Sequence, residues 1–152
     1  MSRPPAARRR RDRSRSRAWF LQVHYRWETE GEGGSMPEAL ADTMGERTVA
    51  PARVRYLERL VSAFVEDRGR VEGAIAACMD NWRLDRLSVM DRGILRLGAT
   101  EILCLSDLPA KVAIQEAVRL AERYGGADSP RFVNGVLDAV YRSVRSDEPG
   151  PA

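Results

Sequence analysis

The chain has 152 residues, 43% hydrophobic and 31% charged, which is long enough for one compact domain with its own core. No apolar run approaches the roughly 18 residues that a membrane-spanning helix needs, and no short apolar block with a cleavage site follows the basic start. These features exclude membrane-spanning and secreted classes, so we expect a soluble, cytoplasmic protein.

Charge is distributed unevenly along the chain. Residues 1–17 hold eight arginines and one aspartate, a balance of +7, whereas the other 17 basic and 21 acidic residues give −4. A strongly basic segment on a mildly acidic body predicts a polyanionic partner. Because this segment has two prolines, no apolar periodicity and strong self-repulsion, we expect residues 1–15 to form a disordered arginine-rich arm. A merely solvated tail is the other interpretation of the same composition.

Helical periodicity begins at Ser16. The apolar face of the first predicted helix ends before the glycines of residues 31–34, and residues 30–48 are polar and predict a loop with at most a short helix. Pro51 suits the first turn of the next long helix, which we expect Gly69 to break before a shorter helix that ends near Cys78.

Three well-delimited helices follow. Ser88 with Asp91 forms a capping-box pattern, Asp107 precedes the second of these helices, and Ser129 precedes the third. No segment alternates with period two, so the sequence predicts an all-α fold of six or seven helices over residues 16–146. Residues 147–152 are expected to be a flexible tail.

Catalytic groups do not converge in this sequence. The only histidine, His24, lies on an apolar helical face, where a packed histidine is far more common than a general base. Two cysteines without CxxC spacing do not complete a zinc site, and no phosphate-binding glycine loop follows a strand. We therefore predict no catalytic residue, metal or cofactor, and a protein that is not an enzyme.

Three stretches carry a resemblance to a known family. They are DLPAKVAIQEAVRLAERYGGADSPRFVNGVLD (residues 107–138), RAWFLQVHYRW and MDRGILRLGATEIL. Together they resemble, in the same order, the NusB family of bacterial transcription antitermination factors. The resemblance is weakest over residues 30–85.

The resemblance implies a compact bundle of about seven helices in two small subdomains. It also implies binding to single-stranded boxA-like RNA of ribosomal RNA leaders, together with the small-subunit ribosomal protein NusE, in an antitermination complex on RNA polymerase. One alternative is the NusB-like domain of ribosomal RNA methyltransferases, which requires a following α/β domain. Another is a helical RNA-binding or protein-interaction module of ribosomal RNA maturation, either as a monomer or as a homodimer.

The resemblance also assigns residues. Those implied to bind RNA are Arg13, Arg15, Arg17, Lys111, Asp128, Ser129, Arg131 and Phe132. Guanidinium groups pair with phosphate and an exposed aromatic can stack on a base, although Phe132 could equally pack on the preceding helix. The residues implied to contact the ribosomal protein are Tyr25 and Asp91. A helix cap explains Asp91 as well as a partner contact does.

Overall fold

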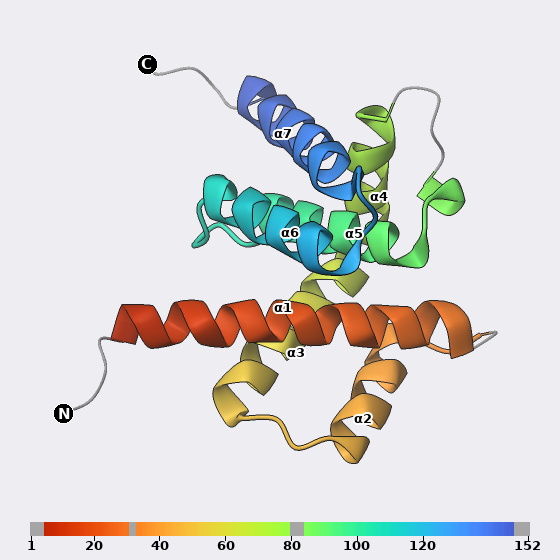
Figure 1. Cartoon of the computed structure of the whole chain (residues 1–152), viewed down its shortest axis with the longest axis vertical. Coiled ribbons are helices and arrows are strands. Elements are labelled where there is room, and N and C mark those ends of the chain that lie inside the picture. Colours follow the sequence, from red (N-terminus) through yellow and green to blue (C-terminus); the bar gives the residue numbers. More distant parts are fainter. Residues whose placement is uncertain (1–4, 31–32, 80–83, 148–152) are drawn as a thin grey trace.

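The fold is that of a computed structural model (Figure 1), which describes residues 5–30, 33–79 and 84–147. These ranges contain seven α-helices and one 3-10 helix, and within them no residue forms a strand, which confirms the predicted all-α fold. The elements are α1 (Pro5–Glu30), α2 (Met36–Glu46), α3 (Pro51–Glu66), α4 (Arg68–Ala77), η1 (Leu84–Arg86), α5 (Val89–Cys104), α6 (Ala110–Tyr124) and α7 (Ser129–Asp147).

The long helix α1 lies between two groups of helices. In Figure 1, α2 and the start of α3 lie on one side of it, α3 passes behind it, and α4 to α7 lie on the other side. α1 packs on α2, α3 and α5, while α5, α6 and α7 pack on one another. The buried apolar residues of both groups form a single cluster, because α3 also packs directly on α5. One core therefore joins the two groups through α1.

The arginine-rich segment differs from the expected disordered arm. Residues 5–15 are the first turns of α1, and residues 1–4 lie outside the described residues. Arginine is a good helix former and proline is accepted in the first turn. Acidic residues also hold this segment to the body: Asp12 pairs with Arg53 at 3.1 Å, and Ser14 donates a 2.8 Å hydrogen bond to Glu116. The self-repulsion seen in the sequence is thus offset by groups distant along the chain.

Within residues 33–48 the structure forms a full helix where the sequence predicted a loop with at most a short helix. α2 spans 11 residues and begins with a capping box, in which the Ser35 side chain accepts from the Glu38 amide and the Glu38 side chain accepts from the Ser35 amide. Met36 and Ala39 are buried against the core. The break between α3 and α4 falls at Asp67, two residues before the predicted Gly69.

The C-terminal helices follow their predicted start and stop signals. The Ser88 hydroxyl accepts a 3.1 Å hydrogen bond from the Asp91 amide at the start of α5, and α6 ends at Gly125. Gly98 brings α5 and α7 together, since a Cβ atom there would lie 2.5 Å from Cδ1 of Leu137. The tail beyond Asp147 lies outside the described residues.

A buried ion pair ties α1 to α5. The side chains of Arg17 and Glu101 are 2% and 1% exposed, and the Arg17 Nε lies 2.8 Å from a Glu101 oxygen. Tyr56 of α3 donates its hydroxyl proton to the same carboxylate. Burial raises the pKa of Glu101, with Arg17 and Tyr56 acting against it, and burial beside Glu101 also raises the pKa of Tyr56. Three helices thus meet at one carboxylate.

A second ionic cluster surrounds His24. Its Nε2 lies 3.0 Å from the Arg96 guanidinium, and Glu28 pairs with both Arg96 and Arg92. Burial, reinforced by Arg96, lowers the pKa of His24 to about 3. Gly93 leaves room for the ring, because a Cβ there would lie 2.8 Å from its Nδ1. His24 is therefore a neutral core residue, as its apolar surroundings in the sequence predicted.

Candidate nucleic-acid interface

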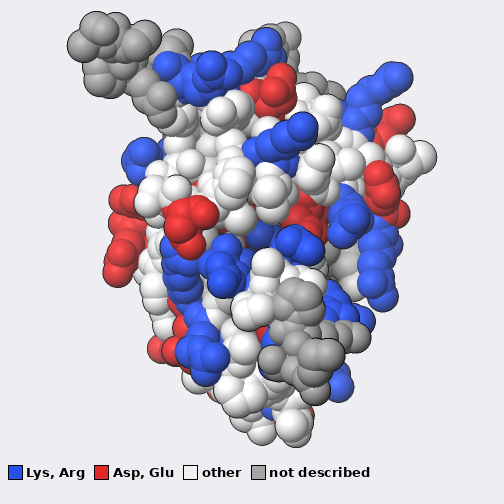
Figure 2. Space-filling model, turned by 90° about the vertical axis from the view of Figure 1, so that its left-hand side faces the viewer, with Lys and Arg blue, Asp and Glu red and all other residues white. Residues whose placement is uncertain are grey.

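The first turns of α1 present a basic surface. Arg8, Arg9, Arg10, Arg11 and Arg15 are all exposed. Figure 2 views the molecule from the side on which α1 begins, and there the Lys and Arg side chains gather in several groups with acidic side chains between them. This end of the helix projects beyond the helices packed around its middle (Figure 1). An exposed cationic end of this kind suits a polyanion.

A cleft runs from this surface between α1, α6 and α7. Its volume is about 940 Å³. The lining residues are Ala7, Arg10, Arg11, Ser14, Val112, Ile114, Gln115, Glu116, Val118, Arg119, Glu122 and Asn134. Three arginines and two amides give donors for phosphate and for base edges, and the two glutamates limit the net charge. We call this the α1–α6 cleft.

The three arginines implied to bind RNA lie in different environments. Arg15 is exposed, whereas Arg13 is 20% exposed and pairs with Asp107 at 3.3 Å. Arg17 is buried, and its guanidinium is used by Glu101 and by Glu116. The prediction that Arg17 contacts RNA is therefore corrected: its side chain does not reach the surface, and it pairs with two carboxylates inside the protein.

The start of α7 carries the second predicted group. Asp128 and Arg131 are exposed, while Ser129 is 6% exposed and its hydroxyl accepts a 2.9 Å hydrogen bond from the Gly126 amide. Ser129 thus shapes the α6–α7 turn. Phe132 is half-buried and packs against the core, as the alternative interpretation of its aromatic side chain predicted. Its role as a base-stacking residue stays a prediction.

Lys111 lies far from that turn. It is exposed in the first turn of α6, and the α7 start follows the opposite end of the same helix. At 1.5 Å per residue, the 13 residues to Tyr124 separate the two ends by about 20 Å. A strand that reached both would have to run along α6, beside the α1–α6 cleft.

Sequence reasoning missed the residues of α6 and α7 that line this cleft. Gln115 and Arg119 are four residues apart on the exposed face of α6. Asn134 is exposed, and its side chain makes no hydrogen bond to the residues that the structure describes. The i, i+4 spacing of two polar side chains opposite an apolar stripe was a usable signal. Only the packing of α1 beside α6 shows that they face Arg10 and Arg11.

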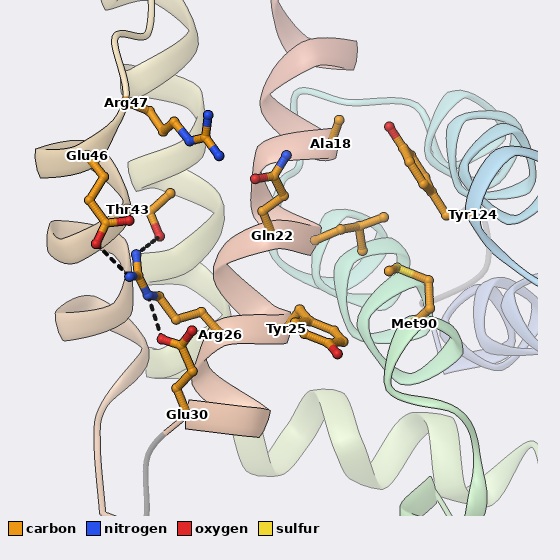
Figure 3. Close-up of a pocket in the computed structure, with 11 residues that line it drawn as sticks. Ala18, Gln22, Tyr25, Arg26, Glu30, Thr43, Glu46, Arg47, Met90 and Tyr124 are labelled. Atoms are coloured by element: carbon orange, nitrogen blue, oxygen red, sulfur yellow. Dashed lines mark hydrogen bonds and ion pairs between the residues drawn. The ribbon is translucent and has the colours of Figure 1, made fainter.

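A separate groove lies at the other end of α1, between α1, α2, α5 and α6 (Figure 3). Its volume is about 420 Å³. Tyr25 and Tyr124, which are 51% and 42% exposed, line it together with Met90. On its far wall Arg26 bonds Glu30, Thr43 and Glu46, at 2.8, 3.2 and 2.7 Å. Exposed aromatic side chains around a groove are typical of a protein-docking surface.

Asp91 lies beside this groove, next to Met90 at the start of α5. Its amide is capped by Ser88, but its carboxylate oxygen Oδ1 is buried, and within the described part of the chain it receives no hydrogen bond. The Ser88 cap therefore uses the backbone of Asp91 and not its carboxylate. Of the two predicted partner contacts, Tyr25 lines the groove and Asp91 lies at its edge.

Neither a metal site nor a membrane span is found in the ranges that the structure describes. No three His, Cys, Asp or Glu side chains there are grouped to hold a metal ion. No helix in those ranges is both long and apolar enough to cross a bilayer.

Comparison with known proteins decides the family. The sequence profile described as "NusB family" matches residues 14–142. The chain belongs to the NusB family. A transcription antitermination protein NusB from Sorangium cellulosum is 39% identical over 132 residues, which cover 87% of this chain and 93% of the relative.

Solved structures of NusB proteins share the fold. NusB of T. maritima is 31% identical, with a TM-score of 0.71, and the match covers 93% of each chain. A chain from the crystal structure of the antitermination factors NusB and NusE in complex with double-stranded RNA is 29% identical, with a TM-score of 0.74. That match covers 89% of this chain and 98% of the other. This agreement confirms the resemblance seen in the sequence.

Proposed function

We propose that this NusB family member is an RNA-binding transcription antitermination factor. In this proposal it binds boxA-like single-stranded RNA of ribosomal RNA leaders together with the ribosomal protein NusE, and it joins an antitermination complex on RNA polymerase in the cytoplasm. Its role is binding, not catalysis. The relatives named above are antitermination proteins, and one of the solved complexes holds NusB, NusE and RNA.

The observation that carries the proposal is the joining of the exposed arginines to the α1–α6 cleft. Arg10 and Arg11 line the cleft from α1, and Arg119 lines it from α6. Guanidinium groups pair with phosphate in a planar geometry and stack on bases. Gln115 and Asn134 add amide donors and acceptors that can read the edges of unpaired bases. The cleft therefore offers both charge and hydrogen-bonding groups to one strand.

The groove beside Tyr25 supports a protein partner on the other half of α1. Tyr25 and Tyr124 expose aromatic surface there, and Asp91 follows the groove residue Met90 in the first turn of α5. Aromatic side chains that fill or flank a pocket dominate the energy of many protein interfaces. We assign this groove to the ribosomal protein.

RNA binding is tested by titration of boxA-like and scrambled RNAs, with and without the ribosomal protein. We expect tighter binding of the boxA-like RNA, a further gain when the partner is present, and a slope of log K against log salt between about −2 and −5. The variant Arg10→Ala/Arg11→Ala should make that slope less steep by about 1.4, because each lost phosphate contact to single-stranded RNA reduces its magnitude by roughly 0.7.

The matched control is Arg86→Ala, which removes an exposed arginine from η1, an element beside Glu28 near the end of α1 rather than at its arginine-rich start. It should leave the slope within error of the wild type. Equal affinity for boxA-like and scrambled RNA would reduce the function to general RNA binding. Light scattering on the free protein tests the homodimer alternative, in which the RNA surface is covered.

Partner binding is tested with Asp91→Ala and Tyr25→Ala. Each should weaken association with the ribosomal protein by at least tenfold, about 1.4 kcal/mol, with a smaller change in the free energy of unfolding. Asp91→Asn keeps the size of the side chain and removes its charge, while the backbone bond to Ser88 is the same in both variants. A normal association constant with a lowered melting temperature for Asp91→Ala would assign the carboxylate to the stability of the start of α5 and not to the partner.

A further inference from the structure

The arginines at the start of α1 point to two opposite sides. Successive residues of an α-helix are rotated by about 100°, because a turn holds 3.6 residues. Arg10 and Arg11 accordingly share one side of α1 with Ala7 and Ser14, and this side lines the α1–α6 cleft. Arg8 and Arg9 share the other side with Asp12. That side does not face α6 or α7, and the proposed RNA cleft does not use it.

The second side of α1 lines a cleft of its own. This α1–α3 cleft has a volume of about 490 Å³. Its charged lining residues are Arg8, Arg9, Asp12, Arg13, Arg55 and Arg59. Five arginines against one aspartate make it more strongly basic than the α1–α6 cleft, which holds three arginines and two glutamates. A cleft with this balance concentrates anions.

Ion pairs within the protein use only part of this charge. Arg59 and Arg13 both pair with Asp107, and Asp12 is taken by Arg53. Within the ranges that the structure describes, no carboxylate pairs with Arg8, Arg9 or Arg55, and all three are exposed. Three guanidinium groups therefore remain available to a ligand.

The start of α3 adds to the same positive field. Ala50 is the N-cap of this 16-residue helix and provides no side-chain acceptor, and Ala52 of the first turn lines the cleft. The first amides of an α-helix carry a partial positive charge that favours phosphate. The uncapped helix start thus faces the same space as the unpaired arginines.

The lining favours a phosphate chain over a base. Tyr56 is the aromatic residue of the cleft, but it is 6% exposed and its hydroxyl donates to Glu101. Arg13 lies over its ring, with the guanidinium carbon 4.7 Å from the ring centroid. The ring is therefore not available as a stacking platform, and the exposed groups recognise charge rather than base identity.

We propose that the α1–α3 cleft binds the phosphate backbone of RNA that continues beyond the segment held in the α1–α6 cleft. This inference rests on the proposed RNA-binding function. An α-helix with its side chains is about 10–12 Å across, so a strand needs only a few nucleotides to pass around the start of α1. One RNA strand then contacts both arginine faces of the helix, and the second contact is independent of sequence.

The test compares a short boxA-like RNA with the same RNA extended by a uridine tract at its 5′ or 3′ end. For the wild type we expect one of the two extensions to raise affinity about tenfold and to steepen the salt slope by about 1.4, which corresponds to two added contacts. The same tract with neutral methylphosphonate linkages should give no gain, because the cleft recognises phosphate charge.

The variant that isolates the cleft is Arg55→Glu. Arg55 lies outside the arginine-rich segment, and a carboxylate in the first turns of α3 suits the helix start, so the fold should be retained. We expect Arg55→Glu to abolish the gain from the uridine tract and to change affinity for the short RNA less than threefold. Arg86→Glu carries the same change of charge on η1 and should keep the full gain.

The outcomes separate the inference from the proposed function. Wild-type protein that binds the short RNA but gains nothing from either extension overturns the inference alone, as does Arg55→Glu protein with an undiminished gain. Wild-type protein that binds neither RNA overturns the proposed function and the inference with it. Circular dichroism and thermal unfolding of each variant confirm that the proteins compared are folded.

Discussion

Arginine serves two different purposes in successive turns of α1. Arg8 to Arg11 and Arg15 are exposed, and within the described residues none of them pairs with a carboxylate. Arg17, two residues after Arg15, is 2% exposed and holds Glu101 in the core. The same residue type is thus a surface charge in one turn of the helix and part of a buried ion pair in the next. What differs is whether the neighbouring helix presents a carboxylate.

The comparison explains why composition alone misjudged the arm. If every arginine of the run were solvated, their mutual repulsion would predict a disordered tail. In the structure Asp12, Asp107 and Glu116 reach or flank the run, and the helical spacing places only some arginines toward them. The remaining arginines keep their charge for a ligand.

The largest effect should come from removing the buried arginine. Arg17→Ala leaves the Glu101 carboxylate buried without its counter-charge, so the free energy of unfolding should fall by about 3–5 kcal/mol. Urea unfolding at pH 7 measures it. Because burial already raises the pKa of Glu101, the loss should shrink as the pH is lowered and the carboxyl group takes up a proton. A loss below 1 kcal/mol would show that the pair does not stabilise α1 against α5.

A smaller, pH-dependent effect should come from the cluster around His24. The pKa of His24 is about 3 in the folded chain and 6.5 as the ordinary value, so the unfolded chain takes up a proton that the folded chain does not. The contribution of His24 to the free energy of unfolding is therefore fully present above pH 6.5 and is lost progressively as the pH falls below that value. At pH 5 the loss is about 2 kcal/mol, at about 1.4 kcal/mol per pH unit.

The measurement is the free energy of unfolding between pH 7.5 and pH 5 for the wild type and for His24→Leu. The variant should show a flatter profile over this window, whatever its stability at pH 7. Glu28 titrates lower: burial acts to raise its pKa, but hydrogen bonds from Arg92 and Arg96 outweigh burial and lower it. A profile as steep in His24→Leu as in the wild type would assign the pH dependence to other groups.

The smallest effect on stability should come from the exposed arginine nearest to Arg17. Arg15→Ala removes a side chain with no ion pair among the described residues, so the free energy of unfolding should change by less than about 0.5 kcal/mol. Affinity for boxA-like RNA at low salt should still fall several-fold if Arg15 meets phosphate. Arg15→Ala with reduced stability and unchanged RNA affinity would contradict the different roles given to Arg15 and Arg17.

Most helices could be predicted from the sequence, because their signals are local. Ser88, Gly125 and Pro51 mark helix ends through hydrogen bonds or backbone angles within a few residues. Helix α2, which the sequence indicated as at most a short helix within a loop, carried the same kind of signal. Ser35 and Glu38 form a capping box there, but the glycines around it obscured that signal. The candidate RNA site was predicted less well, because its lining comes from three helices distant in sequence.

The sequence by itself determined the helical class, the family and the segment where positive charge is concentrated. These follow from periodicity, from motifs such as FVNGVLD and from composition, none of which needs a contact between distant residues. Tertiary structure alone decided which arginines are buried, which side of α1 each exposed arginine occupies and which helix it faces. The physical reason is that an arginine is neutralised or left free by the groups that other helices bring within a few ångströms of it, and a linear pattern contains no record of those groups.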